Sequence, residues 1–193
     1  MKPNFVYSWR ASAALLVLGF GLIHNCQGQA TNTPRTYFEM FDAATEVVLV
    51  KGMVSMGVLN SQIGYPVEIR AEEIKVLRST NAFYAVAVRT TLGEHKVQTD
   101  YIDYDELAGF ISAVSSIKQA DRSVSQLENY DIVFRTRSGL SLNKSTRGSK
   151  VTIFLKSIDP EEVRNVMEAH ILDSFGAYLS AAKARLDLIR VSP

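Results

Sequence analysis

The sequence has almost no cysteine, tryptophan or histidine. Its 193 residues include one cysteine (Cys26), one tryptophan (Trp9) and three histidines. A single cysteine cannot form an intrachain disulfide or a multi-thiolate zinc site. The two histidines beyond residue 30, His95 and His170, lie far apart in sequence and outside spacings typical of a zinc site, such as H-E-x-x-H. We therefore expect neither a bound metal nor a cofactor.

Common catalytic and phosphate-binding motifs are also missing. Neither G-x-G-x-x-G nor G-x-x-x-x-G-K-[ST] occurs. Ser55 lies between Gly52 and Gly57, but it has one residue too many before it for the G-x-S-x-G nucleophile elbow, and its flanks are typical of strand. These motifs therefore identify no catalytic residue, and whether the protein is an enzyme stays open, with a non-enzyme favoured.

Long apolar runs are absent apart from residues 11–23. A helix of this run would reach about 20 Å, short of the roughly 30 Å of a bilayer core. Lys2 and Arg10 precede it, and the segment that follows ends in small residues, with Gly28 and Ala30 in the positions a signal peptidase accepts. This order predicts that residues 1–30 are a cleaved secretory signal peptide and that the mature protein has no transmembrane span.

Cys26 leaves a second interpretation open. It could be the lipidated N-terminus of a bacterial lipoprotein, for which Ile23 fits the usual pattern and Asn25 fits poorly. Cleavage after Ala30 is the favoured prediction. In both cases the protein is exported, to the periplasm or the outside of the cell.

The remaining chain is close to neutral. Of the 21 Lys and Arg residues, Lys2 and Arg10 lie in the leader, so 19 bases and 20 acids remain. Such a balance gives no reason to expect nucleic acid as the partner. Residues 31–45 are interpreted as a polar leader and a short helix near 37–45. Residues 46–193 are interpreted as one domain, with the best internal boundary at 119–129.

Alternating apolar residues, β-branched residues and turn residues predict six to eight strands. We expect strands over residues 46–58, 67–76, 82–88, 97–101, 130–137, 138–143 and 150–156. The apolar phase slips at Glu72-Glu73, which a β-bulge or a break would explain.

Two helices are predicted after the strands. Asp103 is placed to cap the first, over 104–118, with Glu106 three residues on. Asp159 and Pro160 are placed to open the second, which would run towards Ile189 or break near residues 173–176. The expected fold is thus α+β: a mostly antiparallel sheet covered on one face by two helices, the last one long.

The two predicted helix starts resemble each other. Residues 101–114 and 157–170 share the pattern Ile-Asp-x-acid-Glu-aliphatic, and each follows a run of strands. An internal duplication of a strands-then-helix unit would explain this, and so would the general tendency of capped helices after strands to look alike.

Charge asymmetry is the most informative local feature. No acid occurs from Ile132 to Ile158, whereas the same window holds six bases. Arg135 and Arg137 would share a face on a strand, and loop bases could extend it. We expect a partner-binding surface, if one exists, at Arg135, Arg137, Lys144, Arg147 and Lys150. The simpler interpretation is a solvated hairpin whose charge is balanced by acids elsewhere.

The leading hypothesis is an exported, non-catalytic binding or structural domain that uses residues 132–158 for an anionic surface or protein. One alternative is an exported hydrolase that uses carboxylates. The cluster Asp100, Asp103, Asp105 and Glu106 would also suit Ca²⁺, but its spacing departs from the standard calcium loop, and helix capping explains most of it. The other alternative is a carrier of an apolar ligand.

Overall fold

The computed structural model describes residues 36–60, 64–94, 96–157 and 164–191. The predicted leader, 1–30, and Cys26 lie outside these ranges. The described strands are β1 (Leu49–Leu59), β2 (Val67–Val76), β3 (Ala82–Thr91), β4 (Val97–Asp103), β5 (Asn129–Arg135), β6 (Ser141–Arg147), β7 (Lys150–Lys156) and β8 (Arg164–Val166). The helices are α1 (Tyr37–Asp42), α2 (Tyr104–Gln119), the short 3₁₀ turn η1 (Arg122–Val124) and α3 (Ala169–Val191).

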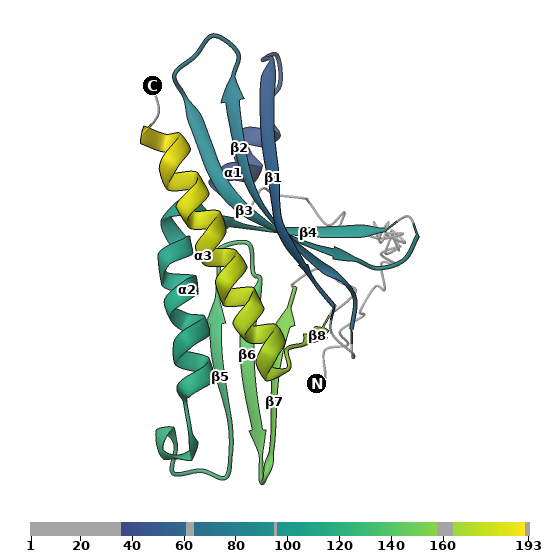
Figure 1. Ribbon diagram of the computed structural model, residues 1–193, viewed down its shortest axis with the longest axis vertical. Helices are drawn as coiled ribbons and strands as arrows, with labels where there is room; N and C mark the ends of the chain where they lie inside the picture. Colours follow the sequence, from purple (N-terminus) through teal and green to yellow (C-terminus); the bar gives the residue numbers. More distant parts are fainter. Residues whose placement is uncertain (1–35, 61–63, 95, 158–163, 192–193) are drawn as a thin grey trace, which may run out of the picture. The chain divides into compact units, whose positions relative to one another are not determined.

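The strands form two antiparallel sheets (Figure 1). Sheet A has the order β1-β2-β3-β4 and sheet B the order β5-β6-β7-β8, so every strand pairs with its neighbour in sequence. The predicted α+β class, the antiparallel pairing and the long last helix are confirmed. The sheet is divided in two, however, because the chain leaves β4 directly into α2 and returns to strand only at β5.

Helices α2 and α3 pack against each other and share one core with both sheets. In α3 the buried residues follow a helical spacing, at Ile171, Leu172, Phe175, Leu179, Ala182 and Leu186. Close approach of α3 to β1 requires a glycine at position 57, because a Cβ there would collide with the ring of Tyr178. Within the described ranges, no helix is both long and apolar enough to cross a membrane.

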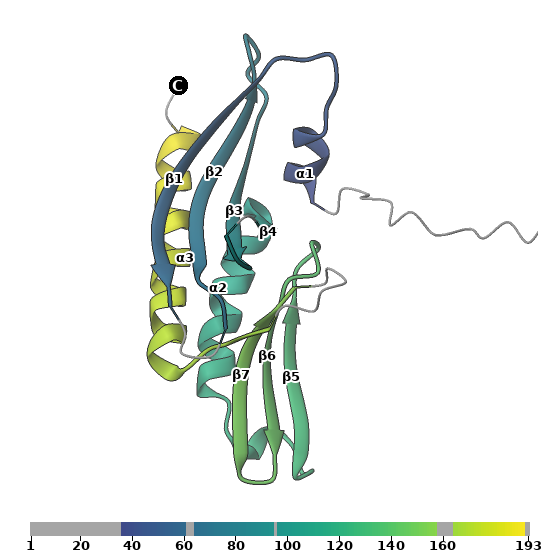
Figure 2. The same cartoon turned by 90° about the vertical axis from the view of Figure 1, so that its right-hand side faces the viewer.

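Strand β2 is continuous, so the predicted bulge or break at Glu72-Glu73 is wrong. Its pairing with β3 runs without a shift from Val67 to Lys75. Ile69 and Ala71 face the helices, whereas Ile74 faces the opposite side and packs with Phe38 of α1. The apolar pattern changes phase because α1 covers the other face of sheet A at that end (Figure 2). The register shift that does occur lies in β1, between Ser55 and Gly57.

Asp103 caps a helix, but a different one from that predicted. It precedes α2, yet its side chain makes no capping hydrogen bond to α2. Its carboxylate instead accepts hydrogen bonds from the backbone amides of Tyr37, at 2.8 Å, and Phe38, at 3.1 Å, in the first turn of α1. Thr36 and Glu39 add a capping box to the same turn. Asp103 therefore fixes α1 to sheet A across more than sixty residues of sequence.

The last helix begins nine residues later than predicted, at Ala169 instead of Pro160. Residues 164–166 form β8, which pairs with the outer edge of β7, and α3 begins at Ala169. Asn165 is almost fully buried, and its side-chain oxygen accepts a hydrogen bond from the Tyr65 amide at 2.8 Å. These contacts hold the segment as a strand. Asp159 and Pro160, the predicted helix start, lie outside the described residues; from Ala169 the helix runs unbroken to Val191.

The order of elements repeats, with four antiparallel strands followed by a helix in each half. The sequence resemblance between residues 101–114 and 157–170 does not follow this repeat, because the first segment spans β4 and α2 while the second contains β8. The repeat of architecture therefore has no support from those two helix starts.

Replacing Asp103 by alanine should release α1. The change leaves two amides of the first turn without their charged acceptor, so the free energy of unfolding should fall by about 1–3 kcal/mol. Hydrogen exchange at Tyr37 and Phe38 should accelerate more than exchange in β4. Asp105→Ala, which removes an exposed carboxylate nearby, is the control and should change stability by less than about 1 kcal/mol. Unchanged protection of α1 in Asp103→Ala would contradict this assignment.

Candidate anion-binding face

Sheet B has two different faces. Residues directly opposite one another on paired strands point to the same side. One side carries Ile132, Phe134, Leu142 and Leu155, which pack in the core with α2 and α3. The other side, here called the outer face, consists of the alternate residues. From one end to the other its rows on β5, β6 and β7 are Arg135, Ser141, Lys156; Val133, Asn143, Phe154; Asp131, Ser145, Thr152; and Asn129, Arg147, Lys150.

Bases gather at the two ends of this outer face. Arg135 and Lys156 lie at one end, and Arg147 and Lys150 at the other. Asp131 is the single acid among the described side chains of the face. The two ends are six residues apart along each strand, about 20 Å at strand rise. The middle carries Asp131 as its one charge, so bases lie at both ends of a polar to apolar centre. On β6, Ser141 and Asn143 are buried, at 2% and 8% exposure, so the exposed part of the face lies along β5, β7 and the Arg147 end of β6.

Three of the five predicted binding residues, Arg135, Arg147 and Lys150, are exposed on this face. Arg135 ends β5 and Lys150 begins β7, and both side chains are exposed. They lie at opposite ends of the outer face rather than side by side.

Lys144 has another role. It lies inside β6 on the core side, only 7% exposed. Its ammonium donates hydrogen bonds to the carbonyls of Ile117, at 3.1 Å, and Ala120, at the end of α2. A helix C-terminus has unpaired carbonyls and a partial negative charge, which a lysine satisfies. Lys144 is therefore a C-terminal cap of α2 rather than an exposed loop base.

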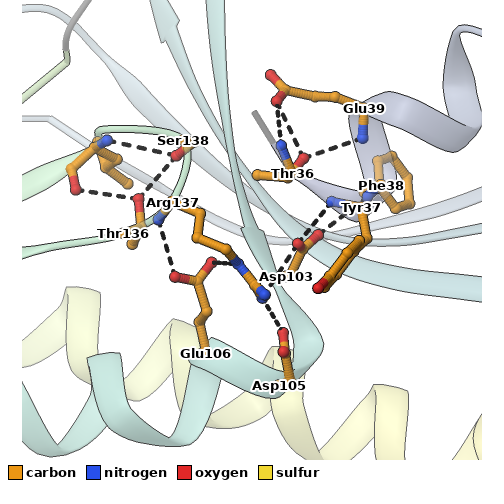
Figure 3. Close-up of polar contacts among 11 residues, drawn as sticks. Thr36, Tyr37, Phe38, Glu39, Asp103, Asp105, Glu106, Thr136, Arg137 and Ser138 are labelled. Atoms are coloured by element: carbon orange, nitrogen blue, oxygen red, sulfur yellow. Dashed lines mark hydrogen bonds and ion pairs between the residues drawn. The ribbon is translucent and has the colours of Figure 1, made fainter. Parts of the chain in front are cut away.

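Arg137 is surrounded by acids (Figure 3). Its guanidinium forms ion pairs with Asp103 at 3.3 Å, with Glu106 at 3.3 Å and with Asp105. It also lies over the ring of Tyr37, 4.6 Å from the centroid. Hydrogen bonding to Asp105 and the three nearby carboxylates raise the pKa of Arg137 against the opposing effect of burial. Arg137 is exposed, but these three acids balance its charge, so it adds no unpaired base to the predicted binding surface.

Arg147 is also paired. It forms an ion pair with Asp131 at 2.9 Å and donates to the carbonyls of Tyr130 and Thr146. The hydrogen bond from Arg147, followed by one from Ser145, lowers the pKa of Asp131. Asp131 therefore stays ionised near neutral pH and offsets one charge at that end of the face.

Lys156 also belongs to the outer face, although it is not among the five bases that the sequence predicts for a binding surface. Lys150 and Lys156 are six residues apart on a predicted strand, so an even spacing places them on one side. That parity was the available signal. Lys144 and Lys150 are also an even number of residues apart in sequence. The turn at Gly148 puts them on different strands, however, and their side chains point to opposite faces of the sheet.

The acid cluster at the start of α2 is used internally. Asp103 binds the amides of α1, and Asp105 and Glu106 bind Arg137. Asp100 accepts a hydrogen bond from Ser157 at 2.7 Å. Among the residues that the structure describes, no group of three or more His, Cys, Asp and Glu side chains is arranged to hold a metal ion.

Comparison with known proteins adds no further constraint, since no family model, curated protein or solved structure matches the chain.

Replacing Lys144 by methionine should destabilise the fold without affecting anion binding. The change keeps side-chain bulk but leaves the carbonyls at the end of α2 without a donor, so unfolding should become easier by about 1–3 kcal/mol in chemical denaturation. Lys150→Met, at an exposed position, should stay within about 0.5 kcal/mol. A Lys144→Met protein of unchanged stability that binds anions poorly would place Lys144 on the binding face instead.

Proposed function

We propose that the protein is an exported, non-catalytic binding domain that holds a linear acidic polysaccharide on the outer face of sheet B. The observation that carries the proposal is the charge distribution of this face. Bases lie at both ends, one acid lies between them, and the described helices pack on the opposite side of the sheet.

Exposed bases that form no ion pair, such as Arg135 and Lys150, cost little stability, since an exposed ion pair contributes only about 0–1 kcal/mol. They preserve a field that attracts anions. Arg135 and Lys150 are exposed, so their charges are available to a partner. Arg137 and Lys144 support the site differently, because they hold the turn after β5 and the strand β6 in place.

The central rows favour a polysaccharide over a lipid bilayer. Val133 is half exposed and Phe154 partly exposed, on either side of the buried Asn143, and they supply apolar contact; the partly exposed Ser145 and Thr152 supply hydroxyl groups in the next row. Sugars present both C–H surfaces and hydroxyl groups, which match these side chains. An anionic bilayer surface would instead bind best to bases spread over the whole contact. Two charged ends about 20 Å apart suit a chain that carries anionic groups at intervals.

Charge reversal tests the proposal. The double variant Arg135→Glu/Lys150→Glu should bind polygalacturonate and dextran sulfate at least about tenfold more weakly than the parent, because attraction is replaced by repulsion. Parental binding should weaken steeply between low and physiological salt, where the screening length falls to about 8 Å. Isothermal titration or retention on immobilised polysaccharide would measure both effects.

A matched control separates the effect of total charge from the effect of charge at the outer face. Arg78→Glu/Arg185→Glu makes the same charge change at exposed positions outside sheet B and should leave binding unchanged. Neutral dextran should not bind. Equal loss in both double variants, salt-independent binding, or preference for anionic vesicles over both acidic polysaccharides would overturn the proposal.

Removing the acid of the outer face should strengthen binding. Asp131→Asn frees Arg147 from its ion pair and raises the local charge by one, so affinity for the same polysaccharides should rise about two- to fivefold. Asp173→Asn, which frees the exposed Lys118 on the helix layer, is the control and should have no effect. If Asp131→Asn instead bound the polysaccharides more weakly, the carboxylate of Asp131 itself would contact the ligand.

A further inference from the structure

The edges of the two sheets are protected unequally. An unpaired edge strand can pair with another chain unless charges, shortness or a cover prevent it. In the described part of the chain, β4 carries Asp100 and Asp103, β5 carries Asp131 and Arg135, and β8 has three residues. Strand β1 is eleven residues long and forms the other edge of sheet A (Figure 1).

The outer part of β1 is exposed and apolar. Large apolar side chains there are 47% exposed at Val50, 57% at Met53 and 40% at Val54, and Val48, just before the strand, is 64% exposed. The strand contains one charged residue, Lys51, which forms an ion pair with Asp42. This edge therefore carries no local net charge, and two copies of it can approach without repulsion.

The backbone of β1 offers a regular set of hydrogen-bonding groups to a partner. The Val48 carbonyl accepts from the Leu77 amide at 2.8 Å, so residue 48 directs its backbone groups towards the β2 side. These directions alternate along an antiparallel strand. Leu49, Lys51, Met53 and Ser55 consequently direct their N–H and C=O groups outward. The register is regular over this stretch and shifts only after Ser55.

We propose that β1 pairs antiparallel with β1 of a second copy of this chain, with Gly52 on the two-fold axis. In this register Leu49 of one copy lies opposite Ser55 of the other, and Lys51 lies opposite Met53. All four outward-directed residues of the regular stretch are then paired. A closed dimer follows, because a two-fold contact uses the same edge on both copies.

The side chains fit this register. Val50 lies opposite Val54 twice, and such β-branched pairs stabilise antiparallel strands. Lys51 meets Met53 rather than another lysine. Gly52 puts no side chain at the axis, and the hollow beside it is lined by Val54 together with Leu186 and Ile189 of α3. Glu73 and Arg185 line the same hollow and Leu186 is fully buried, so beside the axis the edge meets α3 across a mixed apolar and charged hollow.

Oligomeric state is the first test. Sedimentation of the protein expressed from the full chain with Cys26→Ser should show a dimer at micromolar concentration. Val54→Lys should shift it towards monomer by at least about tenfold in dissociation constant, because two lysines would be brought into the contact. Val97→Lys, on the opposite edge of sheet A, is the control and should remain dimeric. A monomeric parent, or open-ended polymers, would overturn the proposal.

A cysteine at the axis tests the register. Positions 52 of the two copies would form a non-hydrogen-bonded pair, with Cα atoms about 4.5 Å apart, within disulfide range. The site has room, since a Cβ on Gly52 would meet only Glu73 at ordinary contact distances of 3.6 and 3.9 Å. Gly52→Cys in the Cys26→Ser chain should form a disulfide-linked dimer in mild oxidant. Val133→Cys, exposed on β5, should not.

The two tests together remain decisive if one variant misfolds. Circular dichroism and thermal melting report whether Val54→Lys and Gly52→Cys are folded. Met53→Pro offers a third route, since it removes an outward N–H without removing a hydrogen bond to β2. A folded Gly52→Cys protein that stays uncrosslinked would contradict the register, and a folded Met53→Pro protein that dimerises normally would contradict pairing through β1.

Discussion

The aromatic contact at Phe110 is the interaction on which the rest of the fold depends. Phe110 is fully buried in α2 and meets Phe134 of β5 and Phe175 of α3 edge to face, at centroid distances of 5.5 and 6.0 Å. Such geometries add about 0.5–1.5 kcal/mol to the burial of the rings. One side chain thereby joins sheet B to both helices, and the same helices carry the core of sheet A. Because the helix layer serves two sheets, each sheet keeps another face for other contacts.

Those other faces are used differently. Sheet A places α1 on part of its second face, fastened by apolar contacts of Phe38 and by the carboxylate of Asp103. Sheet B keeps an outer face with bases at its ends. Two bases near the helices are engaged in internal contacts. Arg137 forms ion pairs with three acids, and Lys144 donates hydrogen bonds to carbonyls at the C-terminus of α2. The bases that remain exposed are the ones that can meet a partner.

Local pattern is enough to predict the α+β class, helix α2 and seven of the strands, six of them to within a few residues at their ends; the seventh, 138–143, overlaps β6 over only three residues. It failed where the decisive contact is distant in sequence. Asp103 has the position of a cap for α2, but the amides it binds belong to α1. Residues 164–166 have helical spacing but pair with β7. The basic cluster was predicted from a strand ending at residue 143; β6 extends to Arg147, which puts Lys144 in the interior. Tertiary contacts likewise determine which of the bases form ion pairs with acidic side chains.

The attachment of α1 has a mechanical consequence. The helix has six residues, and it is held to the sheet by one buried phenylalanine, the Asp103 carboxylate, the ion pair between Asp42 and Lys51, and a few ring contacts. A pulling force applied to the chain before Thr36 would load this small attachment first. It would peel away before the long α3 or the hydrogen-bonded ladders of sheet A carried tension. Helix α1 should therefore detach at low force, which lengthens the chain while the two-sheet body stays folded.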